Sequence, residues 1–331
     1  FFHIASSLIG ILSAFLLMPI IVGRLGVLAW GTVATYLLFL ALTSFFESGY
    51  TTYSRRRFPQ IMVADNVAAF QSEYMFLLNV LKFVGSLYLF GLLILIFSGE
   101  SLLNEKVFVV AAAVLSSFLR ILGGFYRSFL AARNSQSSLA LINGAAQVLR
   151  PCLIAILVLV DVSNLKLLIV GYIFSHILEV VVLKRHASKF MLMHNIGVRV
   201  TKAESQSFNR IYGSYCLSAL LSVFVLNVDK LFSWLFQADL EFAEYSIYST
   251  LAGLFYVVVN SAVTAFNPLL TEMTLRGKAE GIVLFLRFFN LFNGVLIFLG
   301  LLCLLIMHEN LFLLLGVDVG YVSLEKLIML V

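Results

Sequence analysis

Residues 139–160 read LALINGAAQVLRPCLIAILVLV, a mostly apolar stretch of 22 residues. As an α-helix this stretch would be about 33 Å long, which is enough to cross the ~30 Å hydrocarbon core of a bilayer. Its middle carries Asn143, Gln147 and Arg150, at positions i, i+4 and i+7. Residues with this spacing share one face of a helix. We therefore interpret the stretch as a transmembrane helix with a polar stripe.

Arg150 has two interpretations that the residues alone leave open. An arginine near the centre of a bilayer costs about 2.5–3.5 kcal/mol on insertion scales, so such residues usually face a polar interior and serve a function. The helix would then be one wall of a water-filled cavity that handles something anionic. Alternatively, Arg150 pairs with a carboxylate or bends toward an interface, since Pro151 follows it and disfavours helix at the preceding residue.

The composition of the chain is that of a membrane protein with many spans. Of its 331 residues 61% are hydrophobic and 12% charged, whereas soluble domains are about 25% charged. Runs of about twenty apolar residues recur along the chain without period-2 alternation. Such runs predict transmembrane helices and exclude barrel strands. Cys152, Cys216 and Cys303 lie in apolar runs and form neither a metal motif nor a disulfide framework. The predicted spans are 1–22, 30–53, 74–97, 107–130, 139–160, 164–183, 211–236, 243–267 and 282–307, with a tenth beginning near 321.

The basic residues between the spans predict the orientation in the membrane. Loops 54–73, 131–138, 184–210 and 268–281 together hold twelve Lys and Arg residues, and the opposite loops hold only Arg24 and Lys106. Cytoplasmic loops carry such an excess, so we expect the start of the chain to be cytoplasmic. Basic residues in short loops between spans exclude nucleic acid as a partner and favour contact with membrane lipid.

Segment 184–210 divides the predicted spans into two groups. We expect an N-terminal lobe of six helices over residues 1–183, a cytoplasmic loop over 184–210, and a C-terminal lobe over 211–331 with helices seven to ten. The chain begins at Phe1 and stops inside an apolar run at Val331. We therefore expect it to be a piece of a longer protein.

Several cations lie at mid-depth in the predicted N-terminal lobe. They are Lys82, Arg120, Arg127 and Arg150, whereas Glu47 and Glu179 lie only toward the cytoplasmic ends of their spans. If these cations line one cavity, an anionic ligand is one way to neutralise their charge. Alternatively, Glu47 pairs with one cation, Lys82 extends to the interface, and water covers the rest.

Polar stripes also run along the predicted C-terminal lobe. The polar residues of these stripes either line a hydrated lumen or form hydrogen bonds between helices. Asp229 either pairs locally with Lys230 or is a protonatable or cation-binding carboxylate that couples transport to an ion gradient. The stripes consist of Tyr215, Ser222 and Asp229; of Asn260, Thr264 and Asn267; and of Arg287, Asn290 and Asn293.

The sequence lacks the patterns that membrane enzymes of polysaccharide assembly would need. None of the five histidines is followed five residues later by Asp, and there is no acidic cluster, His/Cys set or phosphate-binding glycine loop. We therefore expect a protein that is not an enzyme, with no catalytic residues, no metal site and no cofactor. The pair Gly123-Gly124 lies inside a span and predicts close helix packing.

Three groups of short motifs lie along the chain: Met18-Pro19, Gly23-Arg24-Leu25-Gly26 and Trp30-Gly31; Phe46-Glu47-Ser48-Gly49-Tyr50 with Arg55-Arg56-Arg57; and Asp229-Lys230, Glu244-Tyr245-Ser246-Ile247-Tyr248 and Asn267-Pro268. Together they resemble the motifs of the Wzx-type flippases of lipid-linked oligosaccharides, which serve O-antigen and other surface polysaccharide biosynthesis. That family belongs to the MATE-like MOP flippase superfamily, which also contains drug/cation antiporters. The chain departs from the family pattern at Ser246 and in lacking spans eleven and twelve.

The resemblance implies a two-lobed all-α fold of twelve helices around a central cationic cavity, and alternating access by rocking of the lobes. It implies an undecaprenyl-pyrophosphate-linked glycan as substrate, moved across the bacterial cytoplasmic membrane. Head-group contacts would come from Arg150, Arg120 and Lys82, and H⁺ or Na⁺ coupling from Asp229 or Glu47. Gly26, Gly31 and Gly49 would be structural. The alternative is a multidrug/cation antiporter, which would need acids in the core of the N-terminal lobe.

Overall fold

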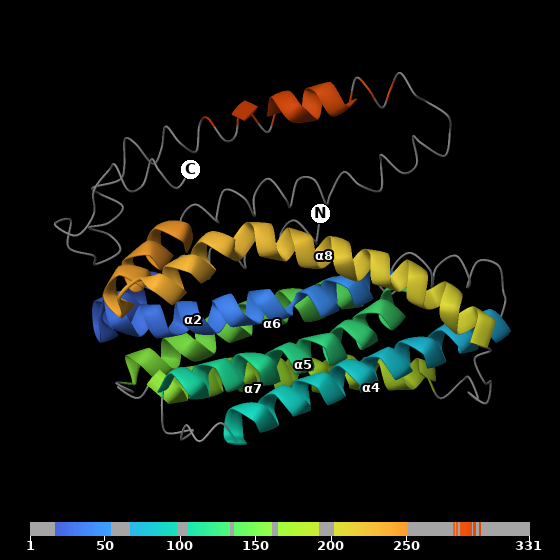
Figure 1. Cartoon of the computed structure of the whole chain (residues 1–331), viewed down its shortest axis with the longest axis horizontal. Coiled ribbons are helices and arrows are strands. Elements are labelled where there is room, and N and C mark those ends of the chain that lie inside the picture. The colour runs from blue at the N-terminus through green and yellow to red at the C-terminus, as the bar shows by residue number, and fades with distance from the viewer. Residues whose placement is uncertain are drawn as a thin grey trace. The chain divides into compact units, whose positions relative to one another are not determined.

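The computed structural model describes residues 17–53, 67–97, 105–132, 136–160, 165–191 and 202–250, and helical residues between 281 and 298 (Figure 1). These described residues are helical apart from short connections, and none of them forms a strand. The predicted all-α class is therefore confirmed. Contacts divide the chain into two compact units, one made of Phe1–Gly31 with Asp239–Val331 and the other of Thr32–Ala238.

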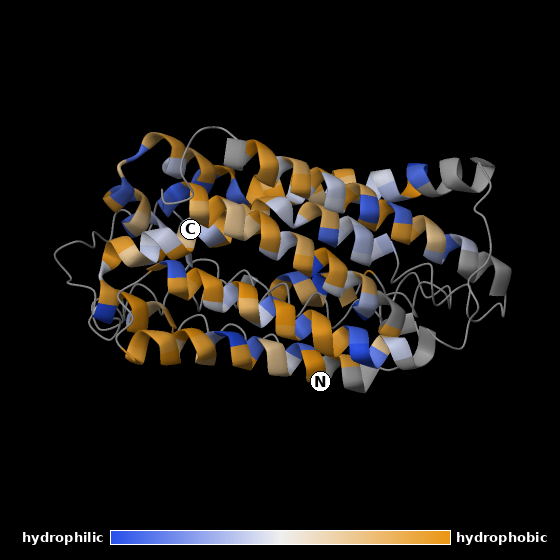
Figure 2. Ribbon diagram, turned by 90° about the horizontal axis from the view of Figure 1, so that it is seen from below, coloured by the Kyte–Doolittle hydropathy of each residue, from blue (hydrophilic) through white to orange (hydrophobic). Residues whose placement is uncertain are grey.

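The larger unit, Thr32–Ala238, holds the long helices. Among the described residues, five helices are long and apolar enough to cross a membrane, and a sixth span is formed if α2 and the short helix Phe45–Tyr53, which meet at 42°, count as one. Apolar residues make up most of the ribbon in Figure 2. The helices are α2 (Val27–Thr43, which begins in the smaller unit), α4 (Val67–Phe97), α5 (Glu105–Ala132), α6 (Gln136–Leu159), α7 (Leu165–Met191) and α8 (Lys202–Phe236).

These helices match the predicted spans, although the span predicted at 30–53 is bent between α2 and the short helix, and several of the others extend past one or both predicted ends. Residues 184–191 and 202–210, which we expected in a loop, belong to α7 and α8. Hydropathy detects only the apolar part of a helix, whereas the backbone hydrogen-bond ladder continues through polar residues beyond it. The spans predicted at 1–22, 243–267, 282–307 and from 321 lie wholly or partly outside the described residues.

Helix α5 packs against both α4 and α7, and α6 packs against α7. Small residues allow this close approach. A Cβ atom added at Gly124 of α5 would lie 2.9 Å from Thr51 Cγ2 of the short helix Phe45–Tyr53, and one at Gly171 of α7 would lie 2.9 Å from Leu157 Cδ1 of α6. The predicted close packing at Gly124 is thus confirmed. This packing brings charged residues of α5, α6 and α7 near one another.

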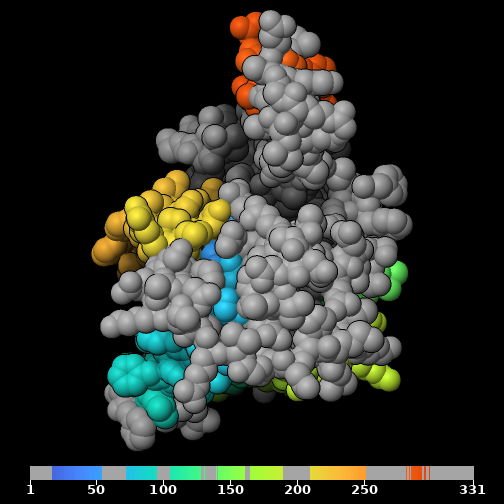
Figure 3. All heavy atoms as spheres, turned by 90° about the vertical axis from the view of Figure 1, so that its right-hand side faces the viewer, coloured from blue at the N-terminus to red at the C-terminus, as the bar shows by residue number. Residues whose placement is uncertain are grey.

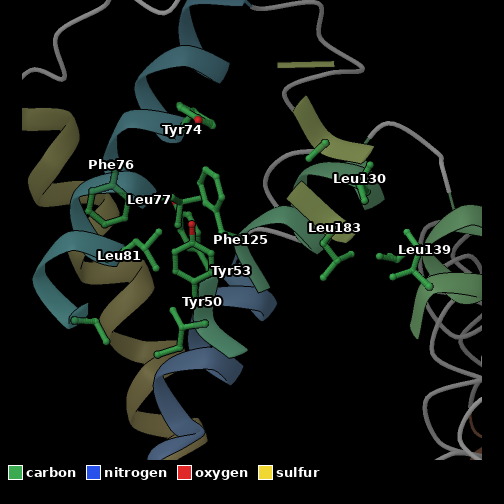
Figure 4. Close-up of a cluster of buried hydrophobic side chains, with 14 of the residues drawn as sticks. Tyr50, Tyr53, Tyr74, Phe76, Leu77, Leu81, Phe125, Leu130, Leu139 and Leu183 are labelled. Carbon is green, nitrogen blue, oxygen red and sulfur yellow. The ribbon is translucent and has the colours of Figure 1, made fainter. Parts of the chain in front are cut away.

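A cluster of aromatic residues joins the short helix Phe45–Tyr53 to α4, α5 and α8. Tyr53 is fully buried, and its ring centroid lies 6.1 Å from that of Phe76 and 6.2 Å from that of Tyr212, edge-on in the second case. Tyr50 and Phe125 lie in the same cluster (Figure 4). Edge-to-face aromatic pairs of this kind stabilise by about 0.5–1.5 kcal/mol beyond the area that they bury.

Helix α8 has a largely exposed surface. No residue in the apolar window of its span Asn209–Phe236 is buried, and α8 side chains are visible at the surface in Figure 3 (yellow). Exposed side chains such as Leu217, Leu221 and Val225 are apolar, as in helices that contact lipid. One turn of α8 nevertheless lies very close to the short helix, because a Cβ atom added at Gly49 would lie 2.9 Å from Cys216 Cα.

The described parts of the smaller unit contain two further glycines with structural roles, Gly26 through its backbone conformation and Gly31 through close packing. Gly26 has φ of 86°, and its N–H donates to the Val22 carbonyl at 2.9 Å, which ends the helix before α2. Positive φ at this position favours glycine. A Cβ atom added at Gly31 would lie 2.8 Å from Ala243 Cβ. The structural roles predicted for Gly26, Gly31 and Gly49 are therefore confirmed.

We expect Gly49→Ala to lower the free energy of unfolding by about 1–3 kcal/mol, the usual cost of overpacking a filled interior. The added methyl group would overlap Cys216, whose backbone cannot move without shifting α8. Thermal unfolding of the full-length protein in detergent measures the effect. Gly91→Ala on α4 is the matched control, because no atom lies within 4 Å of its added Cβ; equal losses in both variants would contradict the proposed contact.

Candidate functional site

A cavity of about 270 Å³ lies among α5, α6 and α7 of the larger unit. Its lining is almost entirely polar, although it lies within three helices that are long and apolar enough to span a membrane. Such polar lining at membrane depth usually marks a functional site. The lining residues are Arg120, Arg127, Asn143, Ala146, Gln147, Arg150, His176 and Glu179.

Helix α6 contributes the polar stripe with which the sequence analysis began. Asn143, Gln147 and Arg150 all line the cavity. The helix continues through Pro151 to Leu159, so Arg150 does not end it. Because proline has no N–H, the Gln147 carbonyl loses its usual helical donor four residues on. Additional backbone polarity therefore lies on the turn that carries Gln147.

Two carboxylates join three arginines beside this cavity. Glu47 of the short helix accepts from Arg127 Nη1 at 3.1 Å, and its Oε2 forms an ion pair with Arg120 Nη2 at 2.8 Å. Glu179 of α7 accepts from Arg127 Nη2 and from Arg150 Nη2, the latter at 3.2 Å. We call this continuous series the ion-pair chain: Arg120, Glu47, Arg127, Glu179 and Arg150.

The ion-pair chain corrects the hypothesis that the mid-depth arginines have few internal counter-ions. Glu47 pairs with two arginines rather than one, and Glu179 pairs with two as well. Three guanidinium groups against two carboxylates still leave one positive charge. The sequence located both acids but could not show that they reach the same site from different helices.

Lys82 does not line this cavity, contrary to prediction. The residues of α4 that pack inward are Leu77, Leu81, Val84 and Tyr88, which are buried at helical spacing. Lys82 lies between them on another face and is exposed. The helical period therefore turns its ammonium group away from the arginines, which agrees with the alternative that Lys82 extends to an interface.

The charges of the ion-pair chain differ in their exposure. The side chains of Arg120 and Arg150 are 30% and 27% exposed, whereas those of Glu47 and Glu179 are only 9% and 6% exposed. The carboxylates thus lie behind the guanidinium groups that they hold. Arg120 and Arg150 are also the two ends of the ion-pair chain, each with one carboxylate partner. The accessible charge at the site is therefore positive.

His176 is a member of the site that the sequence analysis missed. Its side chain is 2% exposed, and Nδ1 lies 3.2 Å from Arg150 Nη2 and 3.8 Å from Glu179 Oε2. Its spacing of three residues from Glu179 was the signal that could have revealed it, because such residues share a helix face. Ser175 beside it accepts from Arg150 Nε at 3.2 Å, which fixes the plane of the guanidinium group.

Four buried polar atoms at the site have no hydrogen-bond partner within the described part of the chain. They are Glu47 Oε2, which is ion-paired with Arg120, and Arg127 Nε, Asn143 Oδ1 and His176 Nε2. Buried polar atoms in native proteins are almost always hydrogen-bonded to protein, water or a ligand. The site can thus offer both donors and acceptors to a polar molecule in the cavity.

The predicted residues of the C-terminal lobe do not line this cavity within the described helices. Tyr215 packs in the aromatic cluster, 6.5 Å from Tyr53 between ring centroids, while Ser222 and Asp229 of α8 are exposed. Arg287 and Asn290 are exposed residues of the smaller unit. Asn260, Thr264, Asn267 and Asn293 lie outside the described residues.

We expect Arg127→Met to lower the free energy of unfolding by about 3 kcal/mol, because it removes the guanidinium group that both carboxylates share. Arg127 is 15% exposed, so water cannot replace it fully. Thermal unfolding in detergent measures the effect, with Lys82→Met as the control that removes an exposed cation. A loss no larger than that of Lys82→Met would show that the ion-pair chain does not hold the helices together.

Comparison with known proteins gives the fold. No family model and no curated protein matches the sequence. Among solved structures, a multidrug resistance MATE family transporter of the MOP superfamily, in an inward-facing conformation, matches with a TM-score of 0.69 at 13% identity, covering 97% of this chain and 75% of that one. A MOP superfamily transporter from Pyrococcus furiosus is also found, with a TM-score of 0.39 at 16% identity, covering 99% and 84%. The chain is a multi-pass membrane protein with the MATE fold.

Proposed function

We propose that the protein transports an anionic, lipid-linked substrate across a membrane by alternating access. The observation that carries this proposal is the exposure of Arg120 and Arg150 at the two ends of the ion-pair chain. Each of these arginines has one carboxylate partner, so its remaining N–H donors can bind an anion in the cavity. The net charge of the ion-pair chain is positive, which favours an anion over a cation.

A polyprenyl-pyrophosphate-linked glycan is the substrate that we infer. Guanidinium groups bind phosphate oxygens in a bidentate way, and the two phosphates of a pyrophosphate offer oxygens to two arginines at once. The amides of Asn143 and Gln147 line the same cavity and suit sugar hydroxyls. The lipid tail would remain in the bilayer and needs only a lateral opening between the lobes.

The buried carboxylates explain how such a site is stable without substrate. Three isolated guanidinium groups in an apolar bundle would be very costly, because the desolvation of each charge is uncompensated. Glu47 and Glu179 offset most of this cost and also hold the arginines in place. A site that is ordered before the anion arrives loses less conformational entropy on binding.

The wider mechanism is part of the proposal. Rocking of an N-terminal lobe, 1–183, against a C-terminal lobe, 211–331, would expose the site alternately to the two sides of the bacterial cytoplasmic membrane, with the start of the chain in the cytoplasm. The protein would act without a cofactor and would contact membrane lipid. H⁺ or Na⁺ would supply the driving force, and Asp229 and Glu47 stay our predictions for the residues that bind it. Such a transporter would serve O-antigen or another surface polysaccharide.

A multidrug or cation antiporter is the competing function, and the transport assay described below separates it from the flippase. A cation would have to bind where Arg120 and Arg150 are the accessible charges, with both carboxylates already paired. That arrangement repels cations at this cavity. A cation site elsewhere in the chain would not involve Arg150.

We expect Arg150→Ala to reduce translocation at least about thirtyfold, the usual cost of truncating one member of a desolvated charge pair. The variant should still fold, because Glu179 keeps Arg127 as partner. The assay uses the full-length protein in liposomes that carry a lipid-pyrophosphate-linked oligosaccharide, and measures the glycan that becomes accessible on the far side. Arg150→Lys should restore part of the rate, since it keeps the charge but loses the two-pronged geometry.

Lys82→Ala is the matched control, because it removes a cation outside the cavity and should leave the rate unchanged. Wild-type rates in Arg150→Ala would rule out the anion cavity. Failure of the folded wild-type protein to move the glycan, together with export of an organic cation such as ethidium, would establish the antiporter instead.

A further inference from the structure

We infer that His176 binds a proton together with the anionic substrate. Each anion that binds in the cavity is then accompanied by the uptake of about one proton. This inference rests on the proposed function, because it assumes that the anion binds at Arg120 and Arg150. It also places a proton-binding group in the cavity itself, apart from the predicted coupling residues Asp229 and Glu47.

The first step is the hydrogen bond that His176 makes in the substrate-free structure. Arg150 Nη2 lies 3.2 Å from His176 Nδ1. Arginine can only donate, so Nδ1 must accept, and an accepting Nδ1 belongs to a neutral imidazole with its hydrogen on Nε2. From this contact with Arg150 we assign His176 the neutral form in the substrate-free site.

The second step is what a proton on Nδ1 would change. A protonated Nδ1 cannot accept from Arg150 and becomes a donor instead. Glu179 Oε2 lies 3.8 Å away, within reach of a small rotation, and it is the oxygen that now holds Arg150 Nη2. Protonation would thus transfer Glu179 Oε2 from Arg150 to His176. Arg150 would keep its Nε contact with Ser175 and turn its other N–H groups toward the cavity.

The third step is the charge balance of the loaded site. A pyrophosphate that is esterified at both ends carries one negative charge on each phosphate. The ion-pair chain has three guanidinium groups and two carboxylates, hence one positive charge. Loading would leave one negative charge uncompensated in a low-dielectric site, which is costly. A proton on His176 supplies the second positive charge and neutralises the loaded site.

No other described group is better placed to take this proton. The groups beside His176 are Arg150 of α6 and Glu179 of α7, and Arg120 and Arg127 of α5 line the same cavity. Tyr172 lies four residues before His176 on α7, with its ring 5.1 Å from that of Tyr36 of α2, and Glu47 is reached through Arg127. The arginines stay charged and the tyrosines stay neutral at physiological pH, and each carboxylate is already ion-paired with two arginines. Histidine is the side chain that ordinarily changes charge in this range.

Linkage makes the inference measurable. If the anion binds the protonated site more tightly, the proton must equally bind the loaded site more tightly. Affinity for the anion should rise by about tenfold per pH unit wherever one proton is taken up on binding. It should therefore increase from about pH 8 to about pH 6, the range in which an imidazole usually titrates.

The test is calorimetric titration of the full-length protein in detergent with a soluble pyrophosphate diester of one sugar and a short isoprenoid. The charge of such a diester does not change over this pH range. Titration in two buffers of different ionisation enthalpy gives the number of protons exchanged. We expect little proton uptake near pH 8, uptake approaching one proton toward pH 6, and tighter binding as the pH falls. The wild-type measurement is decisive by itself and needs no variant.

The His176→Asn variant tests whether His176 is the residue that takes up the proton. The side-chain Oδ1 of the substituted Asn can accept from Arg150 in place of Nδ1 but cannot be protonated. We expect it to bind the diester as the wild type does near pH 8, with no proton uptake and no gain in affinity at lower pH. His186→Asn is the matched control, since His186 is exposed on the same helix, where its Nδ1 lies 3.0 Å from the Val182 carbonyl oxygen; it should keep the wild-type pH dependence.

The outcomes separate this inference from the proposed function. Wild-type binding with no proton exchange would overturn the role of His176 and leave the anion site standing. Proton uptake that persists in His176→Asn would assign the proton to another group and would equally overturn the inference. No binding by a folded wild-type protein at any pH would remove the anion site, and with it the basis of both.

Discussion

Glu179 holds Arg127 and Arg150 at once, and Glu47 holds Arg127 and Arg120. A polar cavity among α5, α6 and α7 can exist in an apolar bundle only because these two carboxylates compensate the arginines. Removing one member of a buried pair leaves the other charge without compensation, whereas an intact network is close to neutral in free energy. The close contacts at Gly124 and Gly171 bring the helices near enough for the pairs to form.

The same network makes the accessible charge of the cavity positive. Because the carboxylates are more buried than the guanidinium groups at either end, a ligand meets positive charge first. A symmetrical burial of both signs would have made a neutral structural cluster with little preference for any ligand. The likeness to a MATE family transporter establishes the fold but not the ligand, since one fold can carry sites of different charge. The proposed preference for an anion follows from the exposure and pairing of these side chains.

His176 connects this electrostatic arrangement with proton binding. Its Nδ1 and the Glu179 Oε2 compete for the same arginine, so a single proton can change which groups of Arg150 are free for a ligand. Networks of this kind respond as a unit, because each pair alters the partners available to the next. The coupling group that the sequence analysis placed at Asp229 or Glu47 thus has a third candidate inside the cavity.

The sequence by itself determined the class of protein, the positions of most spans and the polar stripe on α6, because hydropathy and the helical period are local properties of the chain. Asn143, Gln147 and Arg150 could be assigned to one face for that reason. Only the tertiary structure decided the partners. The pairs Arg127–Glu47, Arg127–Glu179 and Arg150–Glu179 join residues 80, 52 and 29 positions apart, and no periodicity relates them. The rotation of α4 that turns Lys82 away, and the helix crossings that bring His176 against Arg150, depend on how whole helices pack.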